Sequence, residues 1–187
     1  MGVVVVIAGP SGTGKGTVVR RLLEREPRLW YSVSATDRAP RPGEVDGRDY
    51  RFMSHDDFRE LRDLGGFLEW FDVYGDLKGT PRAPIEQHLA AGDDVLVEVD
   101  VQGALAIRDA HPDAFLIFLK PPSREVQRER LLDRDPAADP ADLERRLAAA
   151  AAEEDKAATF DAIVVNDDLD RAVDELVSLI GARRSVG

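Results

Sequence analysis

The sequence has no cysteine among its 187 residues and only three histidines. Disulfide bridges and thiolate metal sites are therefore excluded, and a zinc site is not expected. An excess of positive charge is also missing, because 25 lysines and arginines stand against 36 aspartates and glutamates, a net charge of −11. A general nucleic-acid binder needs a broad basic surface, so we expect no nucleic-acid partner. Any anionic ligand must be held by a local cluster of cations.

Long apolar runs are missing as well. The N-terminal run VVVVIA ends at a glycine, which is too short for a signal peptide or for a membrane span of about 20 residues. We therefore expect a cytoplasmic protein without a membrane partner. The length and the apolar content of 43% are typical of one globular domain with its own core, and they leave both a monomer and a homodimer open.

Short apolar runs alternate with helical patterns along most of the chain. The runs that predict buried parallel strands are residues 3–8, 95–100, 114–120 and 162–165. The stretches that predict helices are residues 15–26, 101–110, 123–134, 140–158 and 168–183. This alternation predicts an α/β fold, in which helices flank both faces of a parallel sheet.

Residues 30–80 interrupt the alternation. The aromatic runs YRF and FLEWFDVY predict short strands, and a helix at 55–64 is expected between them. Ser54 is its expected N-cap, with Asp57 three residues further on. We interpret this region as an inserted small subdomain of mixed α/β structure.

The predicted organisation is therefore a core domain with an insertion. Residues 1–33 and 81–187 form the core, and residues 34–80 form the subdomain. The stretch DRDPAADPAD at 133–142 predicts an exposed connection between two helices. A helical lid is expected around it, over residues 123–158.

The stretch GPSGTGKGT separates the first strand from the first helix. It satisfies the phosphate-binding pattern G-x-x-x-x-G-K, or P-loop, with Gly9, Gly14 and Lys15 at the required spacing. Glycines let backbone N–H groups converge on phosphate oxygens, the helix N-terminus adds partial positive charge, and Lys15 reaches the β and γ phosphates. The sequence therefore predicts ATP binding. The loop residues expected to contact ATP are Gly9, Ser11, Gly12, Thr13, Gly14, Lys15, Gly16 and Thr17.

The loop departs from the pattern at one position. Ser or Thr is expected directly after Lys15, whereas Gly16 follows here and Thr17 supplies the hydroxyl. This variant is common among small kinases that act on nucleoside monophosphates. We expect Mg²⁺ as the second cofactor, with Thr17 as its protein ligand.

A second polar stretch, SATDRAPRPGEVDGRDY, ends at Tyr50. Its prolines and glycines predict a surface loop. Arg38 and Arg41 could hold a dianionic phosphate through their guanidinium groups, and Tyr50 could add a hydroxyl donor. The alternative is that both arginines are ordinary loop charges paired with Asp37 and Glu44.

The motifs resemble those of one family when they are taken in order. GPSGTGKGT, SATDRAPRPGEVDGRDYRF, FLEW, GT, DVQG, RLLDR and VVNDDL follow one another with the spacing of the guanylate kinase family, over residues 3–183. The P-loop alone would not single out this family, but the series does. The resemblance implies transfer of the γ-phosphate of ATP to GMP or dGMP, giving ADP and GDP, in purine nucleotide metabolism.

The resemblance also implies an acceptor site. In the family, the residues that match Arg38, Arg41 and Tyr50 clamp the GMP phosphate. A guanine offers a ring N–H and an exocyclic amine, and Glu69 matches the carboxylate that accepts from them. The alternative for Glu69 is the solvent-facing position of an alternating strand.

Further polar residues match the family around the guanine base. They are Ser34, Thr80 and Asp100. Asp100 could instead simply cap the following helix. Glu98, two residues before Asp100, could orient the water shell of Mg²⁺.

Arginines are expected to approach the transferring phosphate. The family has catalytic arginines at Arg134 and Arg146, beside the P-loop Lys15, and Arg130 is expected on the ATP side. The alternative is salt bridges on the helix surface, which we expect of Arg145 rather than of Arg134 or Arg146. Asn166 and Asp167 match the loop on the adenine side, with an Asx turn before the last helix as the alternative; these two residues and Arg130 complete the expected ATP contacts.

Two positions depart from the family. In GDLKGT, Leu77 and Lys78 replace two tyrosines, the second of which donates its hydroxyl to the GMP phosphate. Lys78 could supply an ammonium group to that phosphate, or point to solvent. Asp37 replaces the usual threonine, and it could orient Arg38 or repel the phosphate.

Two other functions compete. One is a related kinase with a phosphosugar acceptor, against which Glu69 and Asp100 argue. The other is a non-catalytic guanylate-kinase-like domain that binds phosphopeptides, against which the intact P-loop argues.

Overall fold

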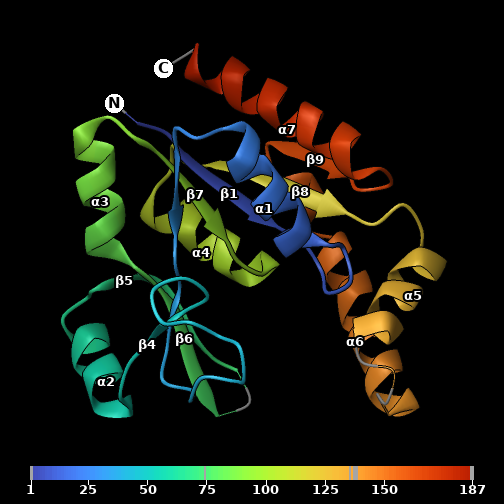
Figure 1. Ribbon diagram of the computed structural model, residues 1–187, viewed down its shortest axis with the longest axis horizontal. Coiled ribbons are helices and arrows are strands. Elements are labelled where there is room, and N and C mark those ends of the chain that lie inside the picture. Colours follow the sequence, from blue (N-terminus) through green and yellow to red (C-terminus); the bar gives the residue numbers. More distant parts are fainter. Residues whose placement is uncertain (1, 74, 135, 137–138, 186–187) are drawn as a thin grey trace.

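The structure is a computed structural model that describes residues 2–73, 75–134, 136 and 139–185. Its strands form a five-stranded parallel sheet and a four-stranded mixed sheet (Figure 1). The start of β1 (Val4–Ala8) and the end of α7 (Leu169–Arg184) lie at the end of the molecule away from the smaller sheet. The helices α5 (Arg124–Arg134) and α6 (Pro140–Glu154) project from the large sheet on the same side as the smaller sheet. The predicted α/β class, with helices on both faces of a parallel sheet, is confirmed.

All neighbouring strands of the large sheet are parallel. From one edge to the other they are β2 (Leu29–Ser32), β7 (Asp94–Glu98), β1 (Val4–Ala8), β8 (Phe115–Lys120) and β9 (Ala162–Val165). Because these strands are parallel, the carboxyl ends of β1, β7, β8 and β9 lie at the same edge of the sheet. In open parallel sheets, ligands bind at this edge.

Helices cover both faces of this sheet, so β1 is buried on both sides. Val6 packs in the core on the side of α3 (Arg82–Ala91) and α4 (Val101–Ala110). The next residue, Ile7, packs in the core on the side of α1 (Lys15–Arg25) and α7 (Leu169–Arg184). Strands with two buried faces have continuous apolar runs rather than alternating ones, which is why the sequence predicts them well.

The helices α5 (Arg124–Arg134) and α6 (Pro140–Glu154) follow β8, and a short 3₁₀ helix η1 (Ala157–Thr159) leads into β9. Three positions of the predicted exposed connection, 135 and 137–138, lie outside the described residues.

Two core elements were missed by the sequence analysis. The strand β2 has four residues, of which Trp30 and Tyr31 are only half-buried, so it lacks a long apolar run. The helix α3 contains Pro84, which favours a turn in a sequence-based interpretation. Pro84 lies in the first helical turn, where no intrahelical N–H partner is needed, so the helix tolerates it.

The smaller sheet has its own apolar cluster. Its strand order is β4 (Arg51–Phe52), β3 (Ala35–Thr36), β6 (Asp76–Pro81) and β5 (Phe67–Val73), with α2 (His55–Asp63) packed beside it. The rings of Phe58 and Phe67 stack with centroids 4.4 Å apart, and Leu77 is buried beside them. The predicted cap of α2 is confirmed, because Ser54 Oγ accepts a hydrogen bond from Asp57 N at 3.1 Å.

Candidate active site

A cavity of about 740 Å³ opens over the loop between β1 and α1. We call it the donor cavity. Its lining includes Ser11, Gly12, Thr13, Gly14, Lys15, Gly16, Thr17, Glu98, Arg130 and Asn166. The structure therefore brings seven of the eight predicted loop residues to one cavity. Gly9 lies behind them and its carbonyl accepts a hydrogen bond of 2.5 Å from Lys15 Nζ.

The backbone of the loop depends on Gly14. This residue has φ = 85°, in the left-handed region, and a Cβ there would lie 2.7 Å from Asn166 Nδ2. Its carbonyl accepts hydrogen bonds from Thr17 N at 3.1 Å and Val18 N at 3.0 Å, which starts α1. Only glycine fits this position, and the result is a helix N-terminus at the cavity, where anions bind.

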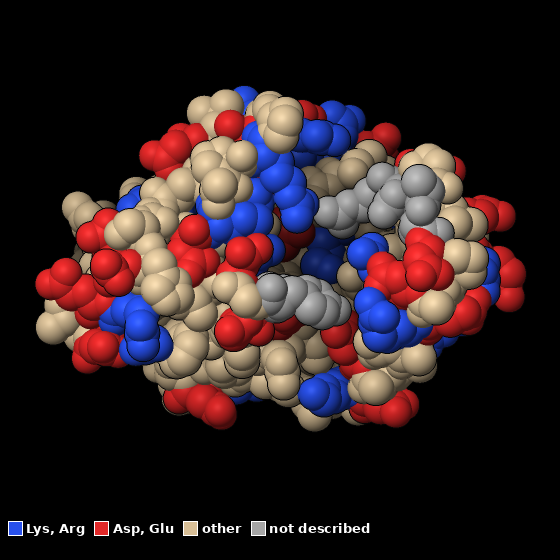
Figure 2. Space-filling view, turned by 90° about the horizontal axis from the view of Figure 1, so that it is seen from below, with Lys and Arg blue, Asp and Glu red and all other residues tan. Residues whose placement is uncertain are grey.

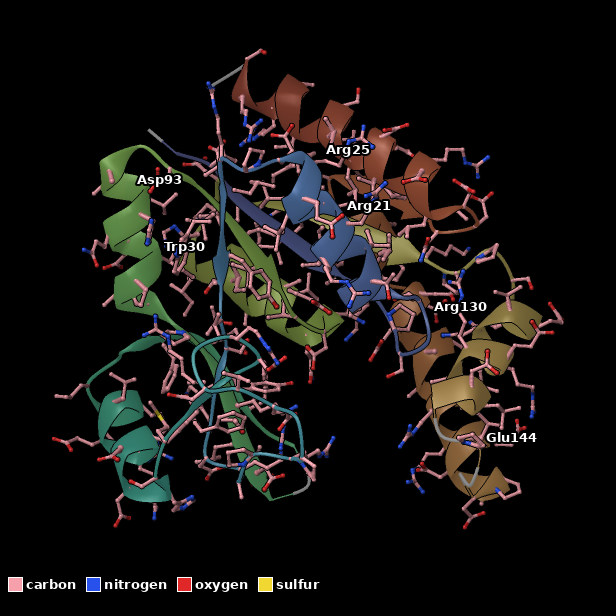
Figure 3. The ribbon with its side chains drawn as sticks, in the orientation of Figure 1. Arg21, Arg25, Trp30, Asp93, Arg130 and Glu144 are labelled. Carbon is pink, nitrogen blue, oxygen red and sulfur yellow. The ribbon has the colours of Figure 1, made fainter. Side chains whose placement is uncertain are left out.

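Side chains of helix α5 donate hydrogen bonds to backbone carbonyls of the P-loop. The side chain of Gln127 is fully buried and donates to Ser11 O at 2.7 Å. Arg130 donates to Thr13 O at 3.1 Å and to Asn166 O at 3.0 Å, and it lies beside the loop in Figure 3. No sequence motif marks Gln127, because its partner is 116 residues away.

Asn166 and Asp167 have different surroundings. Asn166 is buried and its Nδ2 donates to Thr13 O at 2.7 Å. Asp167 is exposed, accepts from Asp168 N at 2.7 Å and pairs with Arg171. The turn alternative fits Asp167, whereas Asn166 belongs to the wall of the donor cavity.

A second cavity, of about 250 Å³, adjoins the first. We call it the acceptor cavity. Its lining is Lys15, Ser34, Tyr50, Glu69, Phe71, Lys78, Gly79, Glu98, Val99 and Asp100. Lys15 and Glu98 line both cavities. Figure 2 shows a central hollow, with lysine and arginine side chains gathered along one part of its rim and acidic side chains along another.

Glu69 is the buried carboxylate of the acceptor cavity. It is 8% exposed, and its Oε1 accepts a hydrogen bond of 2.5 Å from the buried Thr80 hydroxyl. Burial raises the pKa of Glu69 to about 7, against the lowering effect of the Thr80 hydrogen bond, and the negative charge of Asp100 raises it further. The solvent-facing position belongs instead to the next residue, Trp70, which is 41% exposed.

Asp100 caps a helix and also lines the acceptor cavity. Its Oδ1 accepts a hydrogen bond of 2.7 Å from Gly103 N and so caps α4. The same side chain lines the acceptor cavity. The cap fixes its position because the helix N-terminus is itself rigidly packed.

Arg38 is held by Glu44 in this structure. Its two terminal nitrogens donate to the Glu44 carboxylate at 2.9 and 2.8 Å, and its guanidinium carbon lies 5.3 Å from the centre of the Tyr50 ring. Glu44 also accepts from Arg41 N at 2.7 Å. The Arg38 hydrogen bond, followed by the Arg41 N–H, lowers the pKa of Glu44 to about 2. The loop-charge alternative thus describes a real pair, which sets the guanidinium beside Tyr50.

Lys78 points toward the acceptor cavity. Its Nζ lies 3.4 Å from the Tyr50 hydroxyl and 5.1 Å from the centre of that ring. The preceding Leu77 points the opposite way, into the apolar cluster of the small sheet. Of the two alternatives for Lys78, the orientation toward the acceptor cavity is the one that this structure has.

Asp37 makes neither of the two expected contacts. Its Oδ1 accepts a hydrogen bond of 2.7 Å from Leu77 N, and its Oδ2 lies 2.5 Å from His55 Nδ1. The side chain is 6% exposed. Asp37 therefore ties β6 to the start of α2, instead of orienting Arg38 or facing the phosphate site, because both of its oxygens already have closer donors.

The expected catalytic arginines lie on α5 and α6. Arg146 Nε lies 2.9 Å from Asp142 Oδ2 on the same helix, and its side chain is 44% exposed. Arg145 pairs with the same carboxylate. The surface pairing that we expected of Arg145 alone is thus made by Arg146 too, because Asp142 lies one turn before it. Arg134 ends α5, and its side chain lies outside the described part of the chain.

Glu153 was not predicted as a site residue. Burial raises its pKa, and the negative charge of Asp100 raises it further, while Lys15 and Lys156 lower it. Glu153 in the last turn of α6 is thus influenced by the charges of Asp100 and Lys15, which both line the acceptor cavity.

The oxygen groups of the donor cavity fit a phosphate-bound Mg²⁺. Thr17 and Glu98 both line it, and a Cβ on Gly16 would lie 4.0 Å from Glu98 Oε1. In the part of the chain that the structure describes, no three His, Asp or Glu side chains are grouped to hold a metal. Mg²⁺ usually has few protein ligands and takes the others from phosphates and water, so this donor set is suitable.

Comparison with known proteins decides the family. The sequence profile described as guanylate kinase matches residues 1–183. The chain belongs to the guanylate kinase family. The guanylate kinase of Rhodococcus jostii (strain RHA1) is 50% identical over 184 residues, which cover 97% of this chain and 88% of that protein. The guanylate kinase of Mycobacterium sp. (strain MCS) is 49% identical over 100% of this chain and 95% of that protein.

A solved structure agrees with this membership of the guanylate kinase family. The crystal structure of guanylate kinase from Anaplasma phagocytophilum superposes with a TM-score of 0.78 at 31% identity, covering 97% of this chain and 85% of that one. Among the described residues of this family member, no helix is both long and apolar enough to cross a membrane.

Proposed function

We propose that the protein transfers the γ-phosphate of ATP to GMP, or to dGMP, and releases ADP and GDP. The observation that carries this proposal is the pair of adjoining cavities that share Lys15 and Glu98. One cavity has a P-loop, and the other has a buried carboxylate. The relatives at about half identity are named guanylate kinases, which supports the same activity here.

ATP occupies the donor cavity in this proposal. Its phosphates lie at the N-terminus of α1, where the loop N–H groups and Lys15 offset their charge. Arg130 and Asn166, which already contact the carbonyls of the loop, bound the site on the adenosine side. Asp167 is a weaker candidate, because its carboxylate is engaged by Arg171.

The GMP phosphate binds between the loop of residues 38–50 and β6. Arg38, Tyr50 and Lys78 lie together there, and Arg41 is on the same loop. Arg38 shares its donors with Glu44, and the guanidinium has five, so the pair with Glu44 leaves capacity for a phosphate. Lys78 supplies an ammonium group where relatives have a phenol.

The guanine base is recognised by Glu69. Its carboxylate accepts from the ring N–H and the exocyclic amine, while Thr80 holds its other side. Ser34 and Asp100 lie in the same cavity. An adenine would place an acceptor nitrogen against this carboxylate, so the buried acceptor would be left unpaired.

Mg²⁺ would be held by Thr17, with Glu98 orienting its water. When bound, it neutralises charge on the β and γ phosphates. The chain's own residues position the two nucleotides in line: the P-loop on one side, Glu69 and the phosphate cluster on the other, and Lys15 between them.

Closure of residues 123–158 completes the site in this proposal. Arg134 and Arg146 then move toward the transferring phosphate, and Arg146 exchanges Asp142 for it. Exclusion of water from the closed site limits hydrolysis of ATP. The subdomain of residues 34–80 is the GMP-binding unit. The cytoplasmic location stays a prediction.

The two competing functions receive no support. A phosphosugar has no base for the buried Glu69 to recognise, and a phosphopeptide-binding domain needs no donor cavity. The test is ADP release from ATP and Mg²⁺ with GMP, dGMP, AMP, UMP or ribose phosphates as acceptor. Stimulation by GMP and dGMP is expected, and equal stimulation by AMP or by a ribose phosphate would overturn the proposal.

A further inference from the structure

Glu98 lies at the wall that separates the two cavities. It ends β7, lines the donor and the acceptor cavity, and lies on the side of the sheet that α1 covers, near Gly16. In the proposed function Glu98 orients the water of a phosphate-bound Mg²⁺, and it can do so only if its own orientation is fixed. A glutamate side chain has several rotamers, so a neighbour must select one.

Tyr31 is that neighbour. It lies on β2 opposite Leu96 of β7, and side chains two residues apart on a strand share a face, so Tyr31 and Glu98 lie on the same side of the sheet. The Tyr31 ring packs against the core cluster under α1 and α7. The register therefore directs the Tyr31 ring toward Glu98, and hydrogen bonding to Glu98 is among the causes that raise the pKa of this phenol.

The surroundings keep this phenol protonated. Burial raises the pKa of Tyr31, and the negative charge of Glu98 raises it further, followed by smaller effects of Tyr50 and Asp49. A phenol that stays protonated is a permanent donor to a carboxylate.

We infer that Tyr31 is a positioning residue for phosphoryl transfer, which holds the Glu98 carboxylate at the wall between the donor and acceptor cavities. The inference rests on the proposed function, since Glu98 is the group that it serves. It adds a residue that carries no P-loop or acceptor motif. In this inference, packing in the core fixes the Tyr31 ring and thereby its hydroxyl. The hydroxyl donates to one oxygen of the Glu98 carboxylate, and the other oxygen is then directed to the cavities.

The first test is Tyr31→Phe, which keeps the ring in the core and removes only the hydroxyl. We expect kcat to fall about tenfold, as for other partners that orient an active-site ligand, with the KM values for ATP and GMP nearly unchanged. A purely structural role would lower the melting temperature and leave kcat per folded molecule intact. An unchanged kcat overturns the inference.

The second test is a double-mutant cycle with Glu98→Gln. Because Tyr31 acts through Glu98, the double variant should be no slower than Glu98→Gln alone. Full additivity of the two losses overturns the inference, as does a Glu98→Gln variant with normal kcat. Neither result touches GMP-dependent ADP release by the unmodified enzyme, which tests the proposed function by itself.

A third measurement needs no activity. The chain has three tyrosines, and ionisation of their phenols changes the ultraviolet absorbance. In the enzyme without nucleotides or metal, one phenol should resist ionisation at alkaline pH. It should be absent from Tyr31→Phe, and should ionise at lower pH in Glu98→Gln. If Glu98→Gln leaves the resistant phenol unchanged, the two side chains are not in contact and the inference fails.

Discussion

The donor and acceptor cavities are built by different means. The donor cavity is fixed by backbone geometry: the left-handed Gly14, the start of α1, and carbonyls that Arg130 and Asn166 hold. The acceptor cavity is fixed by pairs of side chains from short strands and a loop, such as Arg38 with Glu44 and Glu69 with Thr80. Backbone geometry tolerates few sequences, whereas side-chain pairs can be exchanged, so acceptor recognition is where family members can differ.

The largest effect is expected at Arg146, which leaves Asp142 in the proposed closure. Arg146→Ala should lower kcat about 10²-fold, because a positioned cation at a developing charge contributes on that scale. The matched control is Arg145→Ala, which pairs with the same Asp142 on the same helix and should keep normal kcat. The kcat of both variants is measured from steady-state ADP release. An equal fall of kcat in the two variants would show that Arg146 has no special role in the reaction.

A smaller effect should appear in the pH dependence of GMP binding. In the proposed site the ionised Glu69 accepts from guanine. Its pKa is raised to about 7 by burial, so KM for GMP should be about tenfold higher at pH 6 than well above pH 7. Glu69→Gln is the control, because it lacks the titrating carboxyl group. The pH dependence that remains in its KM for GMP then comes from the GMP phosphate. The same pH dependence in both proteins would show that Glu69 does not bind the base.

The same group has an opposite effect on the free enzyme. Its pKa is above the ordinary 4.5, so the folded state binds a proton more tightly than the unfolded chain. The free energy of unfolding therefore falls as pH rises from about 4.5 to about 7 and then levels off. In Glu69→Gln this decline should be weaker. Denaturant unfolding at a series of pH values measures it, and an identical decline in both proteins would contradict the assignment.

A substitution at Lys78 tests the acceptor side at a position where the sequence departs from the expected family pattern. Lys78→Ala should raise KM for GMP about tenfold or less and leave KM for ATP unchanged, because the ammonium lies in the acceptor cavity beside Tyr50. Lys78→Tyr restores the phenol of the relatives and should retain most of the affinity. Equal KM changes for both nucleotides would show that Lys78 acts elsewhere.

The smallest effect is expected at Asp37. Asp37→Asn weakens the contact with His55 but still offers an oxygen to Leu77 N, so KM for GMP should change only a few-fold, by about 1 kcal/mol or less. Asp37→Ala also removes the Leu77 contact and should lower the melting temperature. If both variants match the parent in KM and in melting, Asp37 has no role in shaping β6.

The sequence predicted the donor side better than the acceptor side for a physical reason. The P-loop and the buried strands follow from local patterns of glycine and apolar residues. Gln127, Tyr31 and the contact of Asp37 with Leu77 depend on which segments meet in space, and no local pattern records that. Glu69 was placed by resemblance, but its burial and its raised pKa became visible only with β5 and β6 paired.

The central claim is that ATP and GMP bind in two separate cavities, which share Lys15 and Glu98 in their lining. Kinetics of Glu69→Gln test it most directly, with ATP and GMP each varied at saturating levels of the other. We expect a KM for GMP raised at least tenfold, an unchanged KM for ATP, and a kcat that falls much less than in Arg146→Ala. A variant that uses GMP as well as the parent does, or that loses ATP and GMP binding together, would contradict it.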